Sequence, residues 1–212
     1  MTNPAALSAG ALLPARKSVL ADRFVTRSIA TDAALIAGGV AVMGVLAQVV
    51  VPLWPVPVTG QTLGVLLVGA TLGARRGALS LLAYALVGLV GLPIFAEHNG
   101  GFASVMLPSF GFIVGFIPAA FAIGWLSERQ WDRHVVRSLV GFLLASLIPF
   151  AVGLPFLGFA LARLGYPHDV SAVLAAGFTP FIVGGIVKWV IAAGMLPLLW
   201  RGVRALDSKK ND

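Results

Sequence analysis

Long apolar runs alternate with short clusters of charged and turn-forming residues along most of this chain. A helix needs about 20 predominantly apolar residues to cross a bilayer. The pattern therefore predicts an all-α membrane protein, a bundle of about six transmembrane helices. The expected helices cover residues 29–51, 61–72, the segment from the turn at 74–77 to 90, 108–126, 138–161 and 180–200. The second is shorter than a full span, which is typical of a tilted or re-entrant segment.

The breaks between these runs divide the chain into three parts. A polar, basic arm covers residues 1–28, a six-helix substrate-binding domain covers 29–201, and a short tail covers 202–212. Inside the domain, two prolines in the segment 54–57 end the first helix, because closely spaced prolines cannot continue it. A Gly-rich connection at 91–107 separates the third and fourth helices.

Composition agrees with the helical pattern. Hydrophobic residues make up 58% of the chain and charged residues only 11%, whereas soluble domains carry roughly 25% charged residues. Lipid must therefore cover much of the surface. The chain contains no cysteine, which excludes disulfides and thiolate metal sites.

The positive charges predict the orientation in the membrane. The N-terminal arm, the loops around Arg75 and Arg133, and the tail hold 13 of the 15 Lys and Arg residues, and the loops of the opposite side hold one, Arg163. Cytoplasmic loops carry the excess of Lys and Arg, so both termini are expected to be cytoplasmic. This distribution also identifies the charges as membrane anchors, and no nucleic-acid partner is expected.

Lys188 is a charge well inside the last expected span, and two interpretations of it remain open. The first is a lysine that snorkels along the helix to the membrane interface. The second is a cation that faces a cavity and binds an anionic group, because charges at membrane depth are costly and usually functional. The acidic residues of the chain lie in loops or near the ends of the expected helices, too far along the chain to neutralise it. A ligand carboxylate would supply the missing partner.

Further polar candidates gather on the expected outer side. Thr59 and Gln61 open the second helix, Asn99 lies in the long connection, and Ser109 opens the fourth helix. The amides of Gln61 and Asn99 both donate and accept hydrogen bonds, which suits a neutral urea or amide group, although Thr59 and Ser109 could equally be plain helix caps. Phe95 is a candidate for an apolar wall. Together these residues predict an outward-facing pocket for a small amphiphile with one anionic end.

Small residues recur every fourth position on the first helix, at Ala33, Ala37 and Ala41. Such stripes allow close helix contacts within lipid, either inside the bundle or with another membrane subunit. The chain has no G-x-x-x-x-G-K-[ST] motif for ATP phosphates and no metal-ligand spacing among its histidines. No catalytic site, metal or cofactor is therefore predicted, and transport would draw its energy from a partner.

Several segments closely resemble one family. They are Pro-Val-Pro-Val-Thr-Gly-Gln-Thr at 55–62, Gly-Ala-Arg-Arg-Gly at 73–77, Gly-Leu-Pro-Ile-Phe at 91–95 and the glycine pair at 100–101. These resemble the BioY family, the biotin-binding S components of energy-coupling factor (ECF) transporters. The resemblance implies a subunit of the bacterial inner membrane that is no enzyme. It would bind biotin from outside and release it inward with a transmembrane coupling subunit and ATPases, and Ala33 and Ala37 match the family's contact surface for the coupling subunit.

Two departures from the family pattern fall near the expected pocket. The family's Gly-Asp-x-x-Lys on the last helix is matched at Lys188, but Gly185 stands where an aspartate is expected. The Pro-Thr-Gly-Gly-Tyr motif before the fourth helix places Phe110 where a glycine is expected and Phe112 where a tyrosine is expected. Two alternatives stay open beside biotin import: a relative that imports another small carboxylated molecule, and a solitary carrier that works without ATPases.

Overall fold

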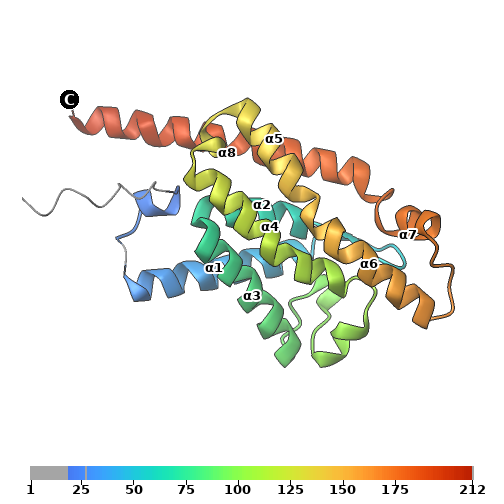
Figure 1. The fold of residues 1–212 in the computed structure, drawn as a ribbon. Helices are drawn as coiled ribbons and strands as arrows, with labels where there is room; N and C mark the ends of the chain where they lie inside the picture. The colour runs from blue at the N-terminus through green and yellow to red at the C-terminus, as the bar shows by residue number, and fades with distance from the viewer. Residues whose placement is uncertain (1–18, 27, 212) are drawn as a thin grey trace, which may run out of the picture.

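Six helical segments run alternately between the two ends of an elongated bundle in the computed structural model, which describes residues 19–26 and 28–211 (Figure 1). They are α1 (Ile29–Ala47), α2 (Gln61–Leu72), α3 (Ala74–Val90), α4 (Phe110–Glu128), the consecutive pair α5 (Val135–Ser146) and α6 (Ile148–Arg163), and α8 (Phe181–Asn211).

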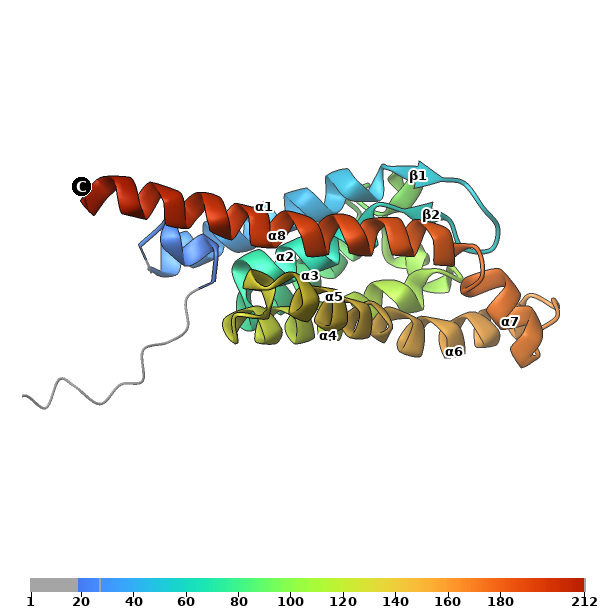
Figure 2. The same ribbon diagram turned by 90° about the horizontal axis from the view of Figure 1, so that it is seen from above.

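The irregular segments collect at the two ends of this bundle (Figure 2). One end carries the short helices η1 (Ala21–Arg23) and η4 (Trp131–Arg133) beside the segment of α8 around Trp200. The other end carries the hairpin β1 (Val50–Val51) and β2 (Val58–Thr59), together with η2 (Ala96–His98), η3 (Phe102–Met106) and α7 (Val170–Gly177). The two strands pair antiparallel, with Val50 opposite Thr59.

Four helical stretches of the described chain are long and apolar enough to cross a membrane: Ile29–Ala47, Phe110–Glu128, Val135–Arg163 and Phe181–Ala205. The protein is therefore an all-helical, multi-pass membrane protein. Helix α2 has only 12 residues, about 18 Å at 1.5 Å per residue, and so falls short of a hydrocarbon core about 30 Å thick. The short second helix predicted from the sequence is thus confirmed in its length.

Several predicted boundaries were wrong. The first helix ends at Ala47 rather than at 51, and the chain continues into β1. The single helix expected at 138–161 is interrupted at Leu147, because Pro149 has no N–H to donate and instead stands in the first turn of α6. Helix α8 continues past residue 200 to Asn211, and helix α7 was not predicted.

Helix α4 lies at the centre of the bundle and packs against α2, α3 and α6. Glycines bring these neighbours close. A Cβ added to Gly69 of α2 would lie 2.7 Å from the carbonyl oxygen of Ala120, and one added to Gly115 of α4 would lie 2.7 Å from the Cα of Pro149. Small residues thus let the central backbones approach, as they commonly do between membrane helices.

A buried carboxyl group ties η4 to α8. Asp132 is fully buried, and the indole Nε1 of Trp200 donates a hydrogen bond of 2.5 Å to its Oδ2. The guanidinium of Arg133 lies 4.0 Å above the Trp200 ring, and Leu20 and Val203 pack around that ring. Burial raises the pKa of Asp132 to about 6, against the opposing effects of the Trp200 hydrogen bond and the Arg133 charge.

Because the folded pKa of Asp132 lies above its ordinary value of 3.8, the folded state holds this proton more tightly than the unfolded state does. The contribution of Asp132 to stability is therefore complete at low pH and is lost as the pH rises from about 4 to 6, by at most about 1.4 kcal/mol per pH unit. Asp132→Asn keeps an acceptor for Trp200 but cannot ionise. In detergent at a fixed heating rate, its Tm should match that of the wild type near pH 4 and exceed it at pH 7. Parallel Tm profiles across this range would contradict the assignment.

Candidate functional site

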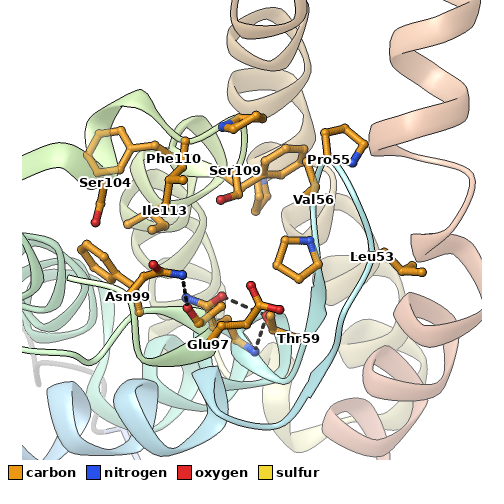
Figure 3. Close-up of a pocket in the computed structure, with 18 of the residues that line it drawn as sticks. Leu53, Pro55, Val56, Thr59, Glu97, Asn99, Ser104, Ser109, Phe110 and Ile113 are labelled. Carbon is orange, nitrogen blue, oxygen red and sulfur yellow. Dashed lines mark hydrogen bonds between the residues drawn. The ribbon is translucent and has the colours of Figure 1, made fainter. Parts of the chain in front are cut away.

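A cavity of about 230 Å³ opens at the end of the bundle that carries the hairpin and the long connection (Figure 3). The hairpin, the start of α2, the connection, α4, α6 and the first residue of α8 all contribute to its wall. Five of the residues predicted to bind a ligand line it: Thr59, Gln61, Phe95, Asn99 and Ser109. The structure thus brings together residues that lie up to 50 positions apart in sequence.

The wall of this cavity has a polar side and an apolar side. Thr59, Glu97 and Asn99 lie together, and Ser109 and Phe110 lie across the opening from them (Figure 3). Apolar side chains complete the wall: Ile113, Phe116, Phe150 and Phe181. Ligand sites are commonly mostly apolar with a few convergent polar groups, and this cavity suits a small amphiphile.

A chain of hydrogen bonds fixes the polar side. The Thr59 hydroxyl donates to Oε1 of Gln61 at 2.9 Å, and Nε2 of Gln61 donates to the Tyr84 hydroxyl at 2.8 Å. The Tyr84 hydroxyl in turn donates to the carbonyl oxygen of Ile94 at 3.0 Å. Thr59, Gln61 and Tyr84 are all buried. The amide of Gln61 is therefore held in one orientation before any ligand binds.

Gln48 holds the outer connection in the same way. Its Nε2 donates to the carbonyl oxygen of Phe95 at 3.0 Å, and its Oε1 accepts from the N–H of His98 at 3.1 Å. Between these contacts, Glu97 and His98 both adopt positive φ, at 58° and 57°, which is uncommon for residues other than glycine. Asn99 donates from Nδ2 to the carbonyl oxygen of Ala96 at 2.9 Å. The rim formed by Glu97 and Asn99 is thus positioned by contacts to α1 and within the connection.

The two candidate caps differ. The Thr59 hydroxyl accepts a hydrogen bond from the N–H of Gln61 at 3.2 Å, so it supports the start of α2 as well as lining the cavity. Ser109 stands at the N-cap position of α4 but makes no capping hydrogen bond. Its hydroxyl is therefore available to a ligand.

Lys188 lies behind the cavity wall rather than on it. Its Nζ donates to the carbonyl oxygen of Thr59 at 2.5 Å and to the Thr62 hydroxyl at 3.0 Å, and both of these residues line the cavity. Within the described residues, no salt bridge involves Lys188. Its ammonium group is directed at protein atoms beside the cavity, and its role in binding stays a prediction.

Gly185 lies apart from this cavity. It lines a separate groove with residues of α5, α6 and α8, and a Cβ added there would meet no atom within 4 Å. Ala33 and Ala37 are exposed on α1, whose buried residues are Gly39, Met43 and Ala47. The roles of Gly185 in binding and of the two alanines in coupling stay predictions.

A model of the BioY family matches residues 15–205. The chain belongs to the BioY family. It is 36% identical over 167 residues to the biotin transporter BioY of Rhizobium etli, covering 76% of this chain and 86% of that protein. It is 35% identical over 151 residues to that of Thermotoga maritima, covering 69% and 82%. It is 37% identical over 180 residues to the putative biotin transporter BioYB of Bacillus subtilis, covering 82% and 90%.

The crystal structure of the S-component for biotin from an ECF-type ABC transporter shares the fold. It superposes with a TM-score of 0.71 at 24% identity, covering 83% of this chain and 95% of that one. BioY proteins are transport proteins and not enzymes, so this BioY chain is a transport protein as well.

Three residues that shape the site of this BioY protein were not among its predicted site residues: Gln48, Tyr84 and Glu97. Tyr84 carried a signal, because a tyrosine inside an apolar helix needs a partner for its hydroxyl when it is buried. The positive φ of Glu97 had none, since the contacts on either side of it join Phe95 and His98 to Gln48, the residue that follows α1. Among the described residues that line the cavity, Glu97 is the only one that carries a charge.

Tyr84→Phe should destabilise the protein. The change leaves Nε2 of Gln61 and the carbonyl oxygen of Ile94 without the hydroxyl that each contacts, and an unsatisfied buried polar group costs about 1–3 kcal/mol. Tyr166→Phe is the matched control, because Tyr166 is 48% exposed and packs against Trp54 at the surface. Thermal unfolding in detergent should show a lower Tm for Tyr84→Phe alone. Equal losses in both variants would show that the hydrogen-bond chain contributes nothing.

Proposed function

We propose that the protein is the substrate-binding membrane subunit of an ATP-driven importer, and that it captures biotin from the outer side of the bacterial inner membrane. Relatives that are 35–36% identical to it over 151–167 aligned residues are named biotin transporters. One observation in this chain carries the proposal. An ammonium group has three donors, and that of Lys188 uses two of them on Thr59 and Thr62, directly behind the cavity wall. The third is left for an anionic end of the ligand.

Biotin matches the chemistry of this cavity. Its urea ring carries two N–H donors and a carbonyl acceptor, which complement the amide of Asn99, the carboxylate of Glu97 and the hydroxyl of Ser109. Its bicyclic body and aliphatic chain are apolar, as are the rings of Phe95 and Phe110. Its carboxylate would accept a charge-assisted hydrogen bond from Lys188.

The proposal includes six membrane spans with both termini in the cytoplasm. It divides the chain into a cytoplasmic arm at 1–28, the substrate-binding domain at 29–201 and a cytoplasmic tail at 202–212. Support comes from the 13-to-1 distribution of basic residues. It comes also from the location of η1, η4 and the end of α8 at one end of the bundle, opposite the cavity.

A transmembrane coupling subunit and ATPases complete the proposed importer. The sequence lacks a phosphate-binding P-loop of its own, and the small side chains of Ala33 and Ala37 are exposed on α1. A solitary carrier would instead import biotin in cells from which every coupling ATPase has been deleted, and that uptake assay separates the two mechanisms.

A different carboxylated substrate is the second candidate. Gly185 supplies no carboxylate, whereas Glu97 places one in the cavity wall from another segment. This arrangement would suit a substrate whose N–H donors lie at other positions than those of the biotin urea ring. Titration of biotin and of other small carboxylic acids into the same purified protein discriminates between the substrates.

Lys188→Met should weaken biotin binding by roughly 10- to 150-fold, because a hydrogen bond to a charged group contributes about 1.5–3 kcal/mol. Biotin amide, which lacks the carboxylate, should lose a similar factor against the wild type and little more against the variant. Isothermal titration calorimetry measures the binding of biotin and of biotin amide to the wild type and to Lys188→Met. Arg163→Gln is the control, because it removes another positive charge near the end of the bundle that carries the cavity. If Lys188→Met binds biotin as tightly as the wild type, Lys188 only joins α8 to α2.

Ala37→Leu should leave biotin binding unchanged and reduce co-purification with the coupling subunit, because a larger side chain prevents close helix approach. Val42→Phe is the control. It enlarges an exposed side chain of the same helix about 140° away from Ala37. A loss of biotin binding with normal complex assembly would show that this surface serves the fold of the subunit itself.

A further inference from the structure

A second cavity, of about 460 Å³, lies at the opposite end of the bundle from the cavity beside the hairpin, between the start of α5 and the segment of α8 around Arg201. It is lined by four basic side chains and three apolar residues: Arg133, His134, Arg137 and Arg201, with Val135, Val136 and Pro197. No acidic residue is found among the described residues of this lining. The lining therefore favours an anion with an apolar part.

Positive charge is concentrated around this cavity. Burial lowers the pKa of Arg133, and the charges of Arg204 and Arg23 lower it further, against the opposing effect of Asp132. Asp132 is itself buried and bound to Trp200, so it presents no carboxylate to the cavity. An anion bound here would offset repulsion among arginines that come from three separate segments.

The start of α5 adds to this field. The helix has 12 residues, and His134 at its N-cap position makes no side-chain capping hydrogen bond. The N-terminus of a helix carries a partial positive charge and unsatisfied N–H groups, which favour phosphate and other anions.

An apolar seam leads away from the cavity along α5 and α8, which pack against each other. On α5, Val136, Val140 and Leu143 are 73%, 47% and 42% exposed and lie on one face of the helix. Farther along the same seam is a groove of about 170 Å³, whose lining includes Leu143 and Trp189. A hydrocarbon chain could thus follow α5 from the basic cavity towards this groove.

We propose that the basic cavity and the seam form a binding site for an anionic phospholipid. The phosphodiester lies against Arg137 and Arg201, and one acyl chain follows the α5–α8 seam. Basic pockets between membrane helices bind anionic head groups in this way. The seam favours a lipid over free phosphate. An acidic partner protein on the coupling surface is disfavoured, because α1 packs against α2 and α3 whereas the cavity lies between α5 and α8.

The test uses native mass spectrometry of the purified protein from bicelles that contain equal amounts of phosphatidylglycerol and phosphatidylcholine with the same acyl chains. Phosphatidylglycerol should be retained preferentially. Arg137→Gln and Arg201→Gln should each lower its retention roughly 5-fold, from about 1 kcal/mol per basic residue. Arg201→Lys, which keeps the charge, should retain most of the lipid. Arg75→Gln is the matched control: it removes one exposed charge from a different turn at the same end and should change nothing.

Four results would overturn the proposal. Equal retention of the two lipids would show no selectivity for the anionic head group, and an equal loss in Arg75→Gln would show a response to net charge alone. Displacement of the lipid by millimolar inorganic phosphate, or equally tight binding of a glycerophosphoglycerol without acyl chains, would indicate a free-phosphate site. Biotin titration of each variant checks that it is folded, because the ligand cavity lies at the other end of the bundle.

Discussion

The hydrogen-bond chain from Thr59 through Gln61 and Tyr84 to the carbonyl of Ile94 holds together the cavity beside the hairpin. It joins the hairpin, the start of α2, the middle of α3 and the long connection. Irregular backbone in a membrane protein needs partners for its polar groups wherever water is absent, and these hydrogen bonds supply such partners for the segments around the cavity. Lys188 adds α8 to the same network through the carbonyl of Thr59. The cavity is consequently formed in advance, which lowers the entropic cost of ordering its walls when a ligand binds.

Helix α8 links two chemically different ends of the molecule. Near its start, Lys188 contacts the start of α2 beside the ligand cavity. Towards its other end, Trp200 hydrogen-bonds to the buried Asp132, and Arg201 lines the basic cavity. Each end anchors the helix with a polar contact that lipid could not replace. Between these anchors the helix is largely apolar and exposed, as expected for a segment that contacts acyl chains.

Features set by local chemistry could be predicted from the sequence. Helix α2 begins and ends where it was expected to, because the prolines before it and Gly73 after it act whatever surrounds them. Five cavity residues were predicted because they all fall in segments of the same side of the bundle. The position of Gly185 could not be predicted from the sequence. Each residue turns a helix by about 100°, and the packing of α8 against its neighbours decides which of its residues face the cavity. Tyr84 was missed because its partners lie 23 and 10 residues away.

Phe150 and Phe181 line both the ligand cavity and the groove that contains Gly185. At this place only aromatic rings separate the cavity from the groove. On this side, a molecule bound in the cavity would therefore be enclosed partly by the protein and partly by the surrounding lipid. A substrate analogue with a hydrocarbon branch there would exchange ring contacts for lipid contacts at little cost, whereas one with a charged branch would have to dehydrate it in hydrocarbon.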